Sequence, residues 1–291
     1  SNDQARSSDV TTHRTPQRLQ RVERRQRRRQ RQMYIRDRRK PHPLRPAPGN
    51  LIEPIRRWAT EAPDRTWLGK RKVVNEGLGD WDLLTYAEAN AKVNAIAQAL
   101  LDRGLDQSTP VMILSGNSIE HALMTYGAIL AGVPAAPVSP SYSTMSSDFD
   151  KLRYVFNLLE PKLIFMQEAA PFERALKALP LDGVELVTVD GSMGTPFATL
   201  LETAPGEAVE KSYAGLHGDM VAKYLFTSGS TGMPKAVITT QRMICVNSIM
   251  PKSVTRDEEH EEHAGLLTRL HCTHCFRGHA ILHTPPTALR P

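Results

Sequence analysis

The residues best suited to chemistry form one short stretch, dense in hydroxyl groups and glycines and closed by a proline and a lysine. It runs Tyr224-Leu225-Phe226-Thr227-Ser228-Gly229-Ser230-Thr231-Gly232-Met233-Pro234-Lys235. Glycines let the backbone approach an anion, hydroxyls donate hydrogen bonds, and Lys235 adds positive charge. The pattern predicts a phosphate-binding loop after a strand, the alternative being a flexible Ser/Gly turn. Gly-Lys-Ser/Thr is absent, which excludes a Walker-type P-loop.

This stretch resembles a motif of the adenylate-forming enzymes, which include acyl-CoA synthetases, luciferases and peptide-synthetase adenylation domains. Their motif is aromatic-Thr-Ser-Gly-Ser/Thr-Thr-Gly-x-Pro-Lys-Gly, and the match begins at Phe226. Ala236 stands where the family usually has glycine, and we expect its methyl group to crowd the loop. Further segments, 81–88 and 127–140, resemble the family, whereas 115–123, 140–143 and 240–243 resemble its feruloyl-CoA synthetase branch.

The resemblance implies a ligase that activates a carboxylate with ATP and Mg²⁺ and passes the acyl group to CoA. Aromatic, hydroxycinnamic acids are the favoured substrates, and the branch implies no protein-held metal site. Catalytic roles fall on Thr227 and Lys235. The residues expected to bind the triphosphate are Thr227, Ser228, Gly229, Ser230, Thr231, Gly232 and Lys235.

Other family elements do not occur in these 291 residues. An adenine-contacting aromatic-Gly-x-Thr-Glu segment, a ribose-binding Thr-Gly-Asp and a catalytic lysine in a small carboxyl-terminal domain are all missing. The resemblance fades near Met250. We therefore expect a truncated, inactive fragment of the ligase, comprising an incomplete large domain over 48–250 that does not complete adenylation.

The order of apolar segments predicts an α/β fold with a mostly parallel sheet and flanking helices, because short apolar runs alternate with helical patterns. Thr85 and Glu88 predict a capping box, and Asn117 or Ser118 the cap of a later helix. Residues 205–218 are expected to form a surface connection. Helices are predicted over 51–62, 85–105, 117–131, 149–159 and 171–179, and strands over 111–114, 135–138, 163–166 and 184–189.

Charge is concentrated at the amino terminus. Residues 1–47 contain 15 Lys+Arg and 4 Asp+Glu, whereas the remainder has 37−15 = 22 basic and 31−4 = 27 acidic residues. Such an Arg/Gln-rich segment buries too little apolar surface to offset the entropy of ordering, so we predict a disordered leader. The alternatives for it are a nucleic-acid-binding arm on a non-enzymatic remnant, a targeting peptide, or untranslated sequence.

The tail over 251–291 contains 6 of the 10 histidines and 2 of the 3 cysteines. Cys272 and Cys275 have metal-ligand spacing, which leaves a small zinc protein as an alternative, but no second matched pair follows. The favoured interpretation is a tail of artefactual origin. An odd cysteine count and the lack of a long apolar run predict a cytoplasmic chain without a membrane span.

Overall fold

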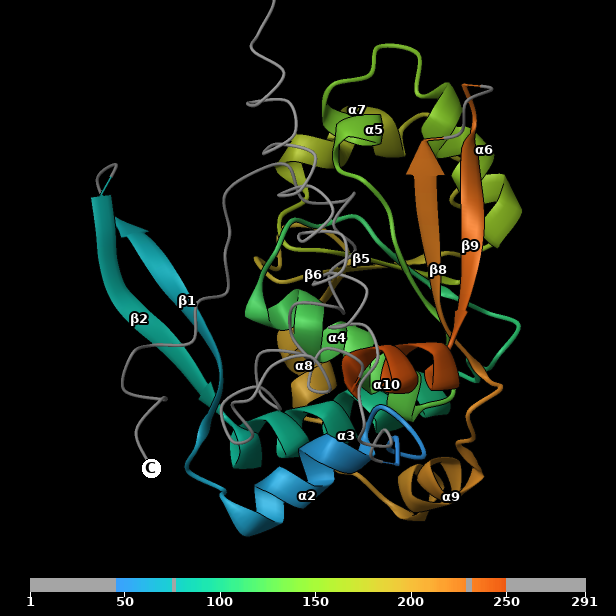
Figure 1. Cartoon of the computed structure of the whole chain (residues 1–291). Helices are drawn as coiled ribbons and strands as arrows, with labels where there is room; N and C mark the ends of the chain where they lie inside the picture. Colours follow the sequence, from blue (N-terminus) through green and yellow to red (C-terminus); the bar gives the residue numbers. More distant parts are fainter. Residues whose placement is uncertain (1–45, 75–76, 229–231, 250–291) are drawn as a thin grey trace, which may run out of the picture. The chain divides into compact units, whose positions relative to one another are not determined.

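The computed structural model describes residues 46–74, 77–228 and 232–249 (Figure 1). All of them belong to one unit, Arg45–Pro291. The disordered leader, the cysteine- and histidine-containing tail and their proposed roles lie outside the described residues and stay predictions.

The described strands form a seven-stranded sheet in the order β7-β6-β5-β3-β4-β8-β9 and a separate antiparallel pair, β1-β2. Six of the seven strands run parallel, and β9 joins β8 antiparallel at one edge. This confirms the predicted α/β class. The strands are β1 (Thr66–Val74), β2 (Gly77–Thr85), β3 (Val111–Ile113), β4 (Ala135–Pro137), β5 (Leu163–Met166), β6 (Glu185–Thr188), β7 (Thr195–Pro196), β8 (Val221–Ser228) and β9 (Pro234–Thr240).

Helices connect these strands and cover both faces of the sheet (Figure 1). They are α2 (Glu53–Glu61), α3 (Tyr86–Asp102), α4 (Ile119–Leu130), α5 (Ser141–Thr144), α6 (Asp150–Leu159), the 3₁₀ helix η1 (Ala170–Phe172), α7 (Glu173–Leu176), α8 (Phe197–Leu201), α9 (Glu207–Gly215) and α10 (Gln241–Ile249).

Alternation along the central strands divides the core into two layers, because successive side chains of a strand point to opposite faces. Val111 and Ile113 of β3 belong to the cluster that packs against α3 and α4. Met112 and Leu114 belong to the other cluster, which packs against α6 and α7. The short apolar runs of the sequence therefore form strands that are buried on both faces.

Local sequence determines where the two longest helices begin. The Thr85 hydroxyl accepts a hydrogen bond from the Glu88 amide, and the Glu88 carboxylate accepts one from the Thr85 amide, so the predicted capping box of α3 is present. Ser118, rather than Asn117, caps α4. Gly127 of α4 lies where the two helices are closest: a Cβ built on it would lie 2.7 Å from the Ile96 Cβ.

The prediction of a surface connection over 205–218 was wrong, because these residues include α9. Val209 of this helix is buried, and Arg56 of α2 lies 3.9 Å above the Tyr213 ring. The same guanidinium pairs with Glu210 at 2.8 Å. These contacts with a distant segment stabilise a helix whose own sequence carries a weak apolar pattern.

Two further differences concern short elements. The helix expected over 171–179 is the 3₁₀ helix η1 followed by a single helical turn, α7. The hairpin β1–β2 was not predicted. No helix among residues 46–74, 77–228 and 232–249 is long and apolar enough to cross a membrane.

Candidate functional site

The predicted phosphate-binding stretch forms the end of the β8–β9 hairpin. Thr227 lies opposite Lys235, and Ser228 lies opposite Pro234. Side chains of directly opposed residues project to the same face of an antiparallel pair, so the hydroxyl of Thr227 and the ammonium group of Lys235 share one face. The structure thus brings together the two residues predicted to act in catalysis. Gly229, Ser230 and Thr231 lie outside the described residues.

Thr227 is held from two sides. The preceding residue, Phe226, is buried in the apolar cluster beneath the hairpin, which anchors the end of β8. The half-buried Thr227 hydroxyl donates a long hydrogen bond of 3.4 Å to the Lys235 carbonyl oxygen. A long bond of this kind is weak, so the hydroxyl is available to exchange it for a stronger acceptor such as a phosphate oxygen.

The turn that closes the hairpin contains a conformation that favours glycine. Gly232 has φ = +89°, and a Cβ built on it would meet no atom within 4 Å. The backbone is therefore open to solvent on the side where a side chain would otherwise stand. Pro234 is buried, whereas Lys235 beyond it is exposed. An open glycine turn next to an exposed cation fits an anionic ligand.

Ala236 does not produce the crowding that its departure from the family motif suggested. It is exposed and lies opposite Phe226 within the hairpin. The extra methyl group points into open space rather than against the described part of the loop. This correction follows from strand β9, which was read as the end of a loop because its apolar residues do not face a core.

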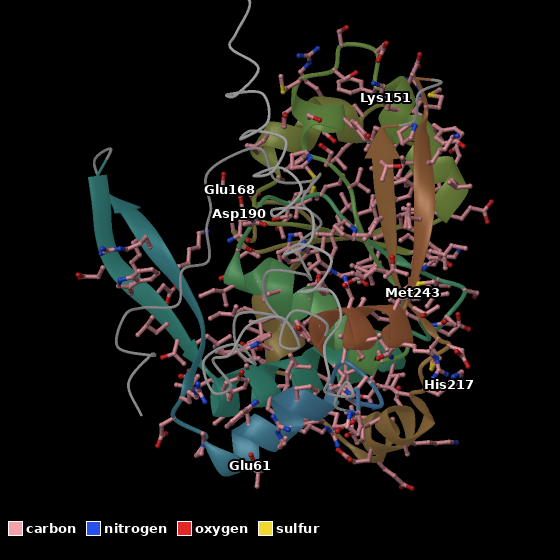
Figure 2. All side chains as sticks on the ribbon, in the orientation of Figure 1. Glu61, Lys151, Glu168, Asp190, His217 and Met243 are labelled. Carbon is pink, nitrogen blue, oxygen red and sulfur yellow. The ribbon has the colours of Figure 1, made fainter. Side chains whose placement is uncertain are left out.

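Other chemical groups lie at the same end of the sheet. Tyr142 and Phe149 belong to the cluster that also buries Phe226, and the Lys151 ammonium nitrogen lies 5.9 Å from the centre of the Tyr142 ring. Lys151 is in the first turn of α6 and appears at the loop end of the hairpin in Figure 2. These positions supply positive charge near the hairpin from a second element.

The structure also contains a pocket of roughly 220 Å³ that none of the predicted site residues lines. It lies between β2, the first turn of α4 and α8, so it is separate from the hairpin. Its lining is mostly apolar: Asp82, Leu83, Leu84, Lys92, Ile119, Glu120, Leu123, Val189, Phe197, Ala198 and Leu201.

Metal ligands are not grouped in the described part of the chain. Residues 46–74, 77–228 and 232–249 contain no cluster of three or more His, Cys, Asp or Glu side chains placed to hold an ion. The donors that the described residues offer at the hairpin are the Thr227 hydroxyl and backbone groups, which suit a magnesium ion carried in by a phosphate chain rather than one held by carboxylates. The hairpin therefore fits the phosphates of ATP better than a resident metal.

Comparisons with known proteins agree on the family. A family model described as AMP-binding enzyme matches residues 55–285, which extends 35 residues past Met250, where we expected the resemblance to end. CymA of Salinispora arenicola, a probable nonribosomal peptide synthetase, is 29% identical over 196 residues, or 67% of this chain and 2% of CymA. The olefin beta-lactone synthetase of Xanthomonas campestris is 28% identical over 198 residues, or 66% of this chain and 34% of that protein.

The fold agrees with this assignment. A solved structure of a fatty acyl CoA synthetase from Mycobacterium tuberculosis matches with a TM-score of 0.51 and 24% identity, over 67% of this chain and 35% of that one. The chain thus spans about a third or less of these two curated relatives and about a third of this structure. Because the family model covers most of its length, the chain belongs to the AMP-binding enzyme family.

Proposed function

We propose that the chain is part of an ATP-dependent ligase that activates a carboxylic acid as its adenylate, and that residues 227–235 hold the triphosphate. The observation that carries this proposal is the pairing of Thr227 with Lys235 at the end of β8–β9, beside the open turn at Gly232. Hydroxyl, cation and exposed backbone then face one anion from one side.

The residues act on the phosphates by position and charge. ATP supplies the adenylyl group, and the Mg²⁺ that accompanies it neutralises part of the phosphate charge. Thr227 donates a hydrogen bond to a phosphate oxygen, and Lys235 places a positive charge where pyrophosphate develops as it leaves. The buried Phe226 keeps the end of β8 in place, so the hydroxyl needs little reorganisation when the ligand binds.

We propose CoA as the acceptor and an aromatic, hydroxycinnamic acid as the substrate. The segments 115–123, 140–143 and 240–243, which resemble the feruloyl-CoA synthetase branch, support this choice. The name of the solved fatty acyl CoA synthetase supports a CoA acceptor, whereas the likeness to a peptide synthetase supports an enzyme that activates another class of carboxylic acid. Ferulate and amino acids are therefore the two substrate classes to compare.

The test measures phosphate binding by the full chain. Calorimetric titration with MgATP and with inorganic tripolyphosphate compares the wild type with Lys235→Met. Loss of one charge-assisted contact costs about 1.5–3 kcal/mol, so we expect both ligands to bind about 10- to 100-fold more weakly. The control is Lys211→Met, which removes an exposed lysine from α9. Equal affinities for wild type and Lys235→Met, with both folded, would refute the phosphate-binding role.

Turnover is a separate measurement. Pyrophosphate exchange into ATP, stimulated by ferulate or by amino acids, reports adenylation itself. Because the adenine, ribose and lysine elements do not occur in the sequence, we expect ligand binding at the hairpin without exchange. Exchange at a rate typical of a ligase would overturn the prediction of an inactive fragment and leave the family assignment intact.

A further inference from the structure

Strand β9 has an open outer edge. It pairs with β8 on one side and has no strand on the other among the described residues, so it ends the seven-stranded sheet (Figure 1). The opposite edge strand, β7, contains only two residues, whereas β9 contains seven. A long edge strand presents a row of N–H and C=O groups that can pair with another chain.

Both faces of β9 are open as well. Val237 is 46% exposed and Ile238 is 56% exposed, and these neighbours point to opposite faces of the sheet. Lys235 is the only charged residue of the strand. Natural edge strands usually carry several charges or are covered, because an apolar edge promotes association. Lys235, near the loop, leaves the middle of the strand without this protection.

We propose that β9 pairs with β9 of a second copy of this chain, in an antiparallel arrangement around a twofold axis at Val237. The proposal does not depend on the chemistry of the hairpin loop. Pairing of this kind is isologous, so the same edge serves both partners and the assembly closes as a dimer. It would join two seven-stranded sheets into one continuous sheet.

The sequence of the strand selects this register. An axis perpendicular to the sheet keeps each side chain on its own face, so opposed residues must be separated by an even number of positions. An axis at Val237 opposes all seven residues of β9, whereas an axis at Ala236 or Ile238 leaves part of the strand unpaired. In the favoured register Val237 faces its own copy, and Ala236 faces Ile238 of the second chain.

Charge also fits this register. Lys235 faces the neutral Thr239 of the second chain, and the two copies of Lys235 are about 14 Å apart along the strands, beyond the screening length of physiological salt. No like charges are opposed along β9. The register therefore combines apolar contact at the centre with charges only toward the ends, as strand addition requires.

The arrangement leaves the loops free. In an antiparallel pair the two hairpin loops lie at opposite ends, so neither Thr227 is covered by the partner. Met243 of α10, which is 58% exposed and lies at the end of the hairpin away from the loop in Figure 2, is placed near the loop end of the second copy. Dimer formation and phosphate binding can thus be measured separately.

The experiment is analytical ultracentrifugation of the full chain over a range of concentrations, with circular dichroism as a check of folding. The test variants are Val237→Lys and Val237→Glu. Each places two like charges about 5 Å apart on the axis, so we expect at least about tenfold weaker self-association. The matched control is Leu158→Lys on α6, which changes a side chain of similar exposure, 52%, away from the edge. It should dimerise like the wild type.

Mixing the two variants tests the position of the axis. Val237→Lys alone and Val237→Glu alone should be monomeric, whereas an equal mixture should recover dimers, because opposite charges then meet at the centre. Recovery also shows that both variants are folded. A monomeric wild type, a dimer that Val237→Lys leaves unchanged, or a mixture that stays monomeric would each overturn the proposal.

Discussion

The closest helix contact of the structure allows a sharp test of its packing. Gly127 of α4 faces Ile96 of α3, and a Cβ at Gly127 would lie 2.7 Å from the Ile96 Cβ and closer still to its Cγ2. Carbon atoms in contact prefer separations of about 3.5–4.0 Å, so Gly127→Ala is short of room by about 1 Å. Both Ile96 and Gly127 are in the core, where neither helix can move without disturbing others.

Two effects of opposite sign determine the result. Overpacking a core by one methyl group costs about 1–3 kcal/mol, whereas replacing glycine by alanine inside a helix contributes up to about 1 kcal/mol of stability. We therefore expect Gly127→Ala to lower the free energy of unfolding by about 1–2 kcal/mol. Gly215 is the matched control, because it is also a helical glycine, at the end of α9, and a Cβ there would meet no atom within 4 Å.

Urea denaturation followed by tryptophan fluorescence measures both variants. Trp67 is fully buried and its ring lies 5.0 Å from the ring of Tyr126 on α4, so its emission reports on this part of the core. Gly215→Ala should be as stable as the wild type or more stable by up to about 1 kcal/mol. If Gly127→Ala proved equally stable, the helices would not be as close as described, and the reasoning would be refuted.

Three other outcomes follow from single contacts. Burial raises the pKa of Glu185, but hydrogen bonds from Arg103 (2.7 Å) and Thr195 (2.8 Å) outweigh it and hold the pKa below 4.5. Its stabilisation is therefore present above the unfolded pKa and lost as pH falls through the lowered folded value, so Glu185→Gln should cost about 1 kcal/mol at pH 7 and flatten the acid limb of urea midpoints. Ser118→Ala removes the cap of α4 and should lower stability by about 1 kcal/mol in the same assay, whereas Ser118→Asp should retain it. Burial raises the pKa of Cys245 to about 12, so mass spectrometry should find its peptide unmodified by iodoacetamide in native protein and alkylated in urea; equal labelling would contradict its burial.

Much of the parallel sheet could be predicted because its signals are local. The apolar run at 163–166 became β5 with the expected bounds, and Thr85 capped α3 through hydrogen bonds that short-range sequence specifies. The feature of the site that sequence could indicate was likewise local: a dense pattern of hydroxyls, glycines and Lys235 in one loop.

The rest depended on distant contacts. Helix α9 carries one buried apolar residue, Val209, and is stabilised by Arg56 from a segment 154 residues away. Strand β9 has no buried face, so period-two alternation could not reveal it, and the pairing of Thr227 with Lys235 remained hidden with it. Burial on both sides, which makes a strand visible in a sequence, was absent there.

The attachment of the β8–β9 hairpin to the sheet has a consequence for its dynamics. Only Ala135 and Lys223 pair between β4 and β8, so beyond that point the hairpin is a two-stranded ribbon anchored by Phe226. A ribbon of two strands is marginally stable, and it opens at a lower free energy than the central strands do. Part of the binding free energy of any ligand at the loop must therefore go into holding the ribbon closed, and the apparent affinity reports the closed population as well as the contacts.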